Sequence, residues 1–136
     1  MFNINDKLSK NKARLLSPIT LAFVGDAVYT LFVREKIVFE KDLKGNELNK
    51  KTSAVVKATA QASYADKILP LLTEEELDIF RRARNTKKNT RAKSASVVEY
   101  NKSTGFEALV GYLYVTGEID RLNYLLNLGE EDEDNR

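Results

Sequence analysis

The sequence predicts a single domain built only of helices. Three observations lead to this prediction: no stretch alternates apolar and polar residues as a strand does, apolar residues recur at helical spacing, and capping residues precede several of these runs. The chain has 136 residues, enough for one hydrophobic core. We expect about six or seven helices in one domain over residues 1–128, followed by an acidic, disordered tail at 129–136.

The first helices are predicted from their caps and composition. One short helix is expected within residues 7–15. Ser17 and Pro18 then form a helix start, because serine caps the first amide groups and proline suits the first helical position. The helix that follows, 18–38, is apolar nearly all round, so we expect it to be the central buried helix.

The middle of the chain predicts two more helices. After a turn at 41–46, apolar residues at helical spacing predict one long helix over 47–69. Pro70 ends or kinks that helix. Thr73 and Glu76 form a capping box, which starts a helix that reaches about residue 84.

The last third of the chain begins with an expected exposed loop at 85–93, which has many cations and no periodicity. A long helix is expected to start near Ser94 or Ser96 and to reach residue 116, with Gly117 as its stop. A final helix is expected over 118–128.

The absence of two residue types restricts the catalytic mechanisms and metal sites that this chain can have. The chain contains no cysteine and no histidine, which excludes thiol nucleophiles, Ser-His-Asp triads, imidazole acid–base pairs and the usual structural zinc site. Catalysis must then depend on carboxylates or on Lys, Arg, Tyr, Ser or Thr side chains. Carboxylates favour hard cations such as Mg²⁺ or Mn²⁺.

The sequence also predicts a cytoplasmic protein without a membrane partner. It has no run of about 18 consecutive apolar residues, so no membrane span is expected. Residues 1–12 lack the apolar region of a signal peptide, and the missing cysteines agree with a reducing compartment.

Charge is unevenly distributed along the chain. The net charge is +2, but the tail has five consecutive acids, and residues 1–128 carry 21 basic against 15 acidic residues. Most of this excess lies in 81–93, which has seven basic residues and no acid. Such a local positive field indicates a polyanionic partner, and a solvated loop is the alternative interpretation.

One carboxylate stands alone in each of the two most apolar stretches. Asp26 is the only acid in 18–33, and Glu107 is the only acid in 105–115. An unpaired carboxylate is costly inside a protein, so a buried one is paired, metal-bound or protonated. We therefore expect each of the two acids, if buried, to be paired with a cation, bound to a metal ion or protonated.

Glycines beside the two acids favour a close crossing of their helices. Gly25 and Gly111 would let these helices approach, and a crossing there would place Asp26 opposite Glu107 as a hard-metal site with open positions for water. The alternative is a salt bridge from each acid to a buried cation, for instance Arg34. The residue types alone do not decide between the two.

The two acidic motifs together resemble those of the ribonuclease III family. The stretch 21–28, LAFVGDAV, is similar to the family's signature helix, and 103–114, STGFEALVGYLY, is similar to its second motif. Residues 48–56 and 82–85 stand in the order that the family has them. The short length, the Gly-Tyr-Leu-Tyr variant and the lack of a trailing double-stranded-RNA-binding domain indicate the Mini-III subgroup of that family.

The resemblance implies an all-α ribonuclease III-type endonuclease domain that works as a homodimer. It implies a Mg²⁺-dependent endoribonuclease, with Mn²⁺ as a substitute, that hydrolyses double-stranded RNA and leaves 5′-phosphate and 3′-hydroxyl ends. Asp26 and Glu107 match the family's catalytic, metal-binding acids. The implied substrate is the precursor of large-subunit (23S) ribosomal RNA, with a ribosomal protein as a helper.

Three positions depart from the family pattern, which has acids where this chain has Ile19, Ala22 and Thr104. Waters, Thr104 as an outer-shell group, or an acid from elsewhere such as Glu99 are expected to replace the lost ligands. The resemblance therefore does not fix the number of metal ions.

Basic and amide side chains form the expected RNA-binding surface, because double-stranded RNA is recognised mostly through its shape, backbone and 2′-hydroxyl groups. The residues are Lys50, Lys51, Arg82, Arg84, Asn85, Lys87, Lys88 and Arg91. For Lys50 and Lys51, a solvated helix face is the alternative. The alternative function for the whole chain is a non-catalytic helical RNA-binding or ribosome-associated module.

Overall fold

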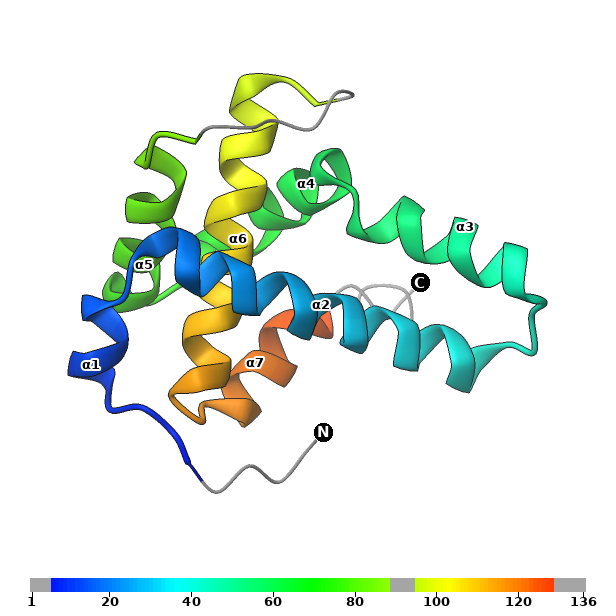
Figure 1. The fold of residues 1–136 in the computed structure, drawn as a ribbon, viewed down its shortest axis with the longest axis horizontal. Coiled ribbons are helices and arrows are strands. Elements are labelled where there is room, and N and C mark those ends of the chain that lie inside the picture. The colour runs from blue at the N-terminus through cyan, green and yellow to red at the C-terminus, as the bar shows by residue number, and fades with distance from the viewer. Residues whose placement is uncertain (1–5, 89–94, 129–136) are drawn as a thin grey trace.

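The computed structural model describes residues 6–88 and 95–128, which form helices joined by short connections (Figure 1). This part of the chain contains seven α-helices, one 3₁₀-helix and no strand, so the all-α prediction is confirmed. The helices are α1 (Lys10–Leu15), α2 (Pro18–Glu40), α3 (Gly45–Val56), α4 (Ala58–Ile68), η1 (Leu69–Leu71), α5 (Glu74–Asn85), α6 (Val97–Val115) and α7 (Ile119–Leu126). None of the described helices is long and apolar enough to cross a bilayer.

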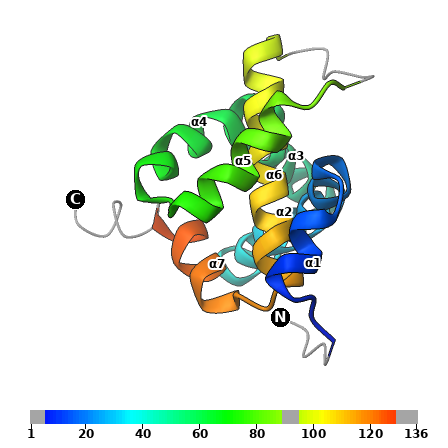
Figure 2. The same cartoon turned by 90° about the vertical axis from the view of Figure 1, so that its left-hand side faces the viewer.

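Helix α6 is the centre of the fold. Figure 2 shows it between α4 and α5 on one side and α2 on the other, and these three helices make its largest packing interfaces. Phe106 of α6 is fully buried, and its ring meets Tyr29 of α2 edge-on at 4.9 Å and Tyr64 of α4 edge-on at 5.7 Å. Aromatic pairs of this geometry contribute about 0.5–1.5 kcal/mol each beyond the area that they bury.

Helix α2 buries only one face, so the prediction of a central buried helix is wrong for its other face. Figure 1 shows α2 running across the front of α6. The side chains of Phe23 and Phe39 are 79% and 78% exposed, and Leu31 and Val38 are exposed as well. An apolar pattern predicts that a helix is covered, but it does not tell whether the same chain or another one covers it.

Most helix ends agree with the predicted caps. The Ser17 hydroxyl accepts from the Ile19 amide at 3.3 Å, with Pro18 at the first helical position. Both hydrogen bonds of the capping box between Thr73 and Glu76 are present, at 3.2 and 2.9 Å. Gly117 has a φ of 77°, and this left-handed conformation, which favours glycine, ends α6 as predicted.

The single helix predicted over 47–69 is wrong, because the chain breaks it at Lys57 into α3 and α4. Lys57 has an extended backbone, with φ −64° and ψ 155°. No glycine or proline marks this break in the sequence. Instead, the Gln61 side-chain amide donates to the Val56 carbonyl at 2.9 Å, which satisfies one of the acceptors that the end of α3 leaves free.

Candidate active site

Helices α2 and α6 touch backbone to backbone where their two glycines meet. A Cβ placed on Gly25 would lie 1.7 Å from the Glu107 carbonyl oxygen, and one placed on Gly111 would lie 2.0 Å from the Leu21 carbonyl oxygen. No side chain fits at either distance, so the crossing requires glycine on both helices. The predicted close approach is therefore observed, and it occurs directly beside the two acids.

The carboxyl groups of Asp26 and Glu107 are hydrogen-bonded to each other across this crossing. Their surroundings differ, because Asp26 is exposed while Glu107 is half-buried. Burial, the hydrogen bond with Asp26 and the charge of Asp26 raise the pKa of Glu107 to about 8, and a hydrogen bond from Gln61 opposes this rise. Two carboxylates at hydrogen-bonding distance repel each other unless a proton or a cation lies between them.

Glu107 is therefore the acid whose ionisation is unfavourable, a difference between the two acids that the sequence did not predict. Asp26 lies at the edge of the uncovered face of α2 and is solvated there. The alternative of a salt bridge to Arg34 is not seen: within residues 6–88 and 95–128 no ion pair joins either acid to a cation. Among the same residues, no group of three or more acidic, histidine or cysteine side chains gathers into a metal cluster.

The two acids open into a cavity of about 470 Å³ between α2, α6 and the segment after α5. Its lining consists of Ile19, Ala22, Phe23, Asp26, Lys87, Lys88, Tyr100, Thr104 and Glu107. The three positions where the family pattern has acids thus all face this cavity. The Thr104 hydroxyl donates to the Tyr100 carbonyl at 3.1 Å, so its oxygen can still accept a hydrogen bond from a water in the cavity.

Glu99, the substitute ligand suggested by the sequence, has another role in the structure. Its carboxylate accepts from the Ser96 amide at 3.1 Å, and the Ser96 hydroxyl accepts from the Glu99 amide. These two bonds form a capping box at the start of α6. Glu99 is not part of the cavity lining.

The cations predicted to bind RNA near the end of α5 do not all line the acidic cavity. Lys87 and Lys88 line the acidic cavity, and together with Arg84 and Asn85 they also line an adjoining cavity of about 490 Å³. Arg84 donates to the Asn85 side chain at 3.2 Å. Arg82 instead donates to the Arg14 carbonyl at 3.1 Å, which ties α5 to the end of α1.

Lys88 has a structural task that the sequence did not reveal. Its ammonium group donates to the carbonyls of Ala83, Arg84 and Thr86 at 2.7, 3.0 and 2.7 Å. Burial lowers the pKa of this ammonium group. The lysine satisfies carbonyls at the end of α5 and holds the cavity wall in place, as cations near helix C-termini do.

The remaining predicted RNA contacts lie away from the acids or outside the described residues. Lys50 is exposed on α3. Lys51 lines a separate cavity of about 320 Å³ together with Tyr29 and Tyr64. Arg91 belongs to residues 89–94, which the structure does not describe, and the acidic tail at 129–136 likewise lies outside the described residues.

Sequence reasoning missed two residues of the site, Gln61 and Tyr100. Gln61 comes from α4 and donates a hydrogen bond to Glu107. It occupies the buried stripe of α4 with Ala62, Ala65 and Ile68, and a lone polar residue on an apolar stripe was the signal that could have found it. Tyr100 lies between the acidic cavity and the adjoining one and lines both.

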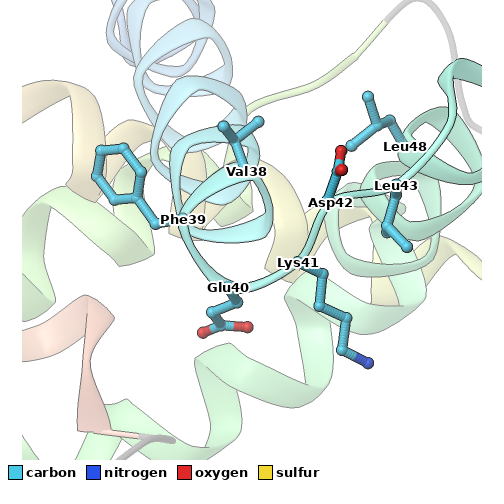
Figure 3. A pocket seen from close by; sticks show the side chains of 7 residues that line it. All are labelled: Val38, Phe39, Glu40, Lys41, Asp42, Leu43 and Leu48. Atoms are coloured by element: carbon cyan, nitrogen blue, oxygen red, sulfur yellow. The ribbon is translucent and has the colours of Figure 1, made fainter.

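A hollow of about 450 Å³ at the connection between α2 and α3 offers a comparison (Figure 3). In Figure 3 the Phe39 ring points away from Leu43 and Leu48, and the charged side chains there are Glu40, Lys41 and Asp42. The lining of this hollow includes neither of the two acids Asp26 and Glu107 nor the glycines of the helix crossing. We therefore assign the candidate active site to the cavity of Asp26 and Glu107.

Known proteins are similar to this chain in sequence and in fold. A family model, the Ribonuclease III domain, matches residues 19–118. A protein named Mini-ribonuclease 3 from Thermoanaerobacter sp. is 52% identical over 89% of this chain and 85% of its own length. The chain belongs to the Mini-ribonuclease 3 family. The Mini-ribonuclease 3 of Clostridium tetani is 42% identical over 97% of this chain and 91% of its own length.

A solved structure agrees with the Mini-ribonuclease 3 assignment. The crystal structure of a protein from Fusobacterium nucleatum superposes with a TM-score of 0.78 at 34% identity and covers 85% of this chain and 93% of that one. Membership in the Mini-ribonuclease 3 family confirms the prediction of an endoribonuclease. Asp26, Thr104 and Glu107 all lie inside the matched segment, and their roles stay predictions.

Proposed function

We propose that this endoribonuclease cleaves double-stranded RNA by metal-assisted hydrolysis of a phosphodiester bond, with Asp26 and Glu107 as the ligands of Mg²⁺. Mn²⁺ is expected to replace Mg²⁺, and the products to carry 5′-phosphate and 3′-hydroxyl ends. The observation that carries the proposal is the hydrogen-bonded acid pair at the α2–α6 crossing, open to a cavity with lysines on its wall.

The donor set fits a hard divalent cation. Two ionised carboxylates at this crossing would repel each other, and Glu107 is half-buried as well. Both effects disfavour its ionised form and raise its pKa to about 8. A cation between them would remove the repulsion, as the shared proton does in its absence. Oxygen ligands and space for several waters are typical of Mg²⁺ sites, and the 470 Å³ cavity has that space.

When bound, Mg²⁺ supplies positive charge to the phosphate in the transition state and lowers the pKa of an attacking water. Asp26 and Glu107 would hold the ion beside the glycine crossing, where the backbones of α2 and α6 are in close contact. Lys87 adds positive charge to the wall of the cavity. Lys88 stabilises that wall by donating hydrogen bonds to three backbone carbonyls. Thr104 can hold a water beside the acids.

The positively charged stretch that begins in the last turn of α5 supports a duplex RNA substrate. Arg84, Asn85, Lys87 and Lys88 surround the cavity next to the acids, where the RNA backbone would continue beyond the cleaved bond. We propose them, with Arg82, Arg91, Lys50 and Lys51, as the RNA-binding set. The substrate proposed from the family resemblance is precursor 23S ribosomal RNA in the cytoplasm, with a ribosomal protein as helper.

The test of the proposal compares substrates and metals with the unmodified protein. We expect cleavage of a duplex RNA in Mg²⁺ or Mn²⁺, little cleavage of a single strand of the same sequence, and loss of activity when a chelator removes the metal. End-labelled RNA on a denaturing gel measures all three and identifies the product ends. Undiminished cleavage in the chelator contradicts the metal, and tight RNA binding without cleavage favours the non-catalytic RNA-binding module.

The exposed face of α2 supports the proposed homodimer. Ile19, Phe23 and Leu31 are exposed along it, and large apolar side chains that are exposed along one helix face can mark a protein–protein interface. The acid pair lies at the edge of this face, so a second copy would bring a second active site to the same assembly. Two sites are what cleavage of both strands of a duplex requires.

Replacing Leu31 by Asp should turn the dimer into a monomer. A carboxylate would then be buried without a partner in the interface, so we expect the dimer dissociation constant to rise by roughly 100-fold or more. Sedimentation at micromolar concentration measures the change. Leu71→Asp is the matched control, because Leu71 is similarly exposed, 44% against 38% for Leu31, but lies on η1. Only monomer in the unmodified protein would contradict the dimer.

A further inference from the structure

Among the residues that the structure describes, Gln61 is the one fully buried amide side chain, and it lies beside the acid pair. It is 2% exposed and lies on α4, the helix that packs against α6 from the side opposite to α2. Its neighbours on the buried stripe are alanines and an isoleucine. Burying an amide there is unfavourable unless both ends of the group are hydrogen-bonded.

The hydrogen bonds of Gln61 fix the direction of its amide. The Val56 carbonyl can only accept, so the atom that meets it at 2.9 Å is the amide nitrogen Nε2. The Gln61 side chain also donates to the Glu107 carboxylate. The break between α3 and α4 thus has a consequence for the site, since it frees the carbonyl that anchors the donor facing Glu107.

We propose that Gln61 is a positioning residue that orients the Glu107 carboxylate for metal binding. This role rests on the proposed function, because it assumes that Glu107 is a metal ligand. A hydrogen bond from a fixed donor restricts the rotamers that a carboxylate can adopt and so orients its oxygens.

The experiment measures Mn²⁺ binding to the full-length, metal-free protein by calorimetry. Gln61→Met keeps the length of the side chain but removes the donor, and Gln61→Asn keeps an amide that is one methylene too short. We expect both variants to bind Mn²⁺ about 10- to 100-fold more weakly, the range found when groups that support metal ligands are removed. Gln61→Asn retains a polar group and serves if Gln61→Met does not fold.

A matched control distinguishes the proposed positioning role of Gln61 from a purely structural role. Thr116 is also buried and donates to a backbone carbonyl, that of Tyr112 at 2.7 Å, but it lies at the far end of α6. Thr116→Val should lower the melting temperature and leave Mn²⁺ affinity unchanged, whereas the Gln61 variants lower both.

Two outcomes would overturn the proposal in different ways. Parental Mn²⁺ affinity in a folded Gln61 variant, with weakened binding in Glu107→Gln, overturns the role of Gln61 and leaves the proposed function standing. Parental affinity in Glu107→Gln itself, or no Mn²⁺ binding by the parent, overturns the metal site and the role of Gln61 with it.

Discussion

Glu107→Gln should lower the rate of duplex RNA cleavage by about 10³-fold or more while the protein stays folded. The change is isosteric, so the α2–α6 crossing is kept, but one of the two carboxylates that we propose as metal ligands is lost. Losses of this size are typical when a group that acts in the transition state is removed. Single-turnover cleavage at saturating RNA and Mg²⁺ measures the chemical step.

Asp26→Asn should have a similar effect, because we propose that both acids bind the same ion. The control is Asp78→Asn, which neutralises an exposed acid on α5 outside the cavity lining. It should cleave at the parental rate. If Glu107→Gln also cleaves at the parental rate, Glu107 is not a ligand and the site must be sought elsewhere.

The same substitution should raise stability at alkaline pH when no metal is present. The pKa of Glu107 is raised to about 8 in the folded protein, above its value near 4.5 in the unfolded chain. A carboxyl group shifted in this direction contributes stability below pH 4.5, and that contribution is lost as the pH rises through 8. The groups that face Glu107 are Asp26, Gln61 and the lysines of the cavity wall.

We therefore expect the chelated parent to melt at a lower temperature at pH 9 than at pH 6, by roughly 5 °C or more, since 1 kcal/mol shifts the melting temperature of a domain this size by about 4 °C. In Glu107→Gln this difference should shrink, and in the parent Mg²⁺ should reduce it at pH 9. An equal pH dependence in parent and variant would assign the effect to other groups.

The parts of the fold that the sequence predicted are those with a local physical signal. Ser17 before Pro18, the capping box of Thr73 and the left-handed Gly117 each depend on residues within one turn of chain. The meeting of Asp26 and Glu107 was predictable because each acid has a glycine on its helix, and glycines at a crossing allow backbones to touch.

The parts that were not predictable depend on contacts between distant segments. The break at Lys57 has no breaker residue, and it is stabilised by a side chain four residues later. The three carbonyls that accept from Lys88 come together only when α5 ends where it does. The burial of Glu107 and the exposure of Asp26 depend on which face of each helix the rest of the chain covers.

Gly111→Ala should strongly destabilise the protein. The new Cβ would lie 2.0 Å from the Leu21 carbonyl oxygen, which is a backbone atom of a helix and cannot turn away. Overpacking of a core commonly costs about 1–3 kcal/mol, and a clash with rigid backbone belongs above that range. We expect the melting temperature to fall by more than about 10 °C, measured by circular dichroism.

The matched control is Gly45→Ala, because a Cβ on Gly45 meets no atom within 4 Å. Gly45 is the first residue of α3, where alanine is a better helix former than glycine, so this variant should melt at or slightly above the parental temperature. Parental melting of Gly111→Ala would mean that α2 and α6 can move apart at no cost. The same movement would separate the carboxyl groups of Asp26 and Glu107, so any Gly111→Ala protein that folds should also bind Mn²⁺ more weakly than Gly45→Ala does.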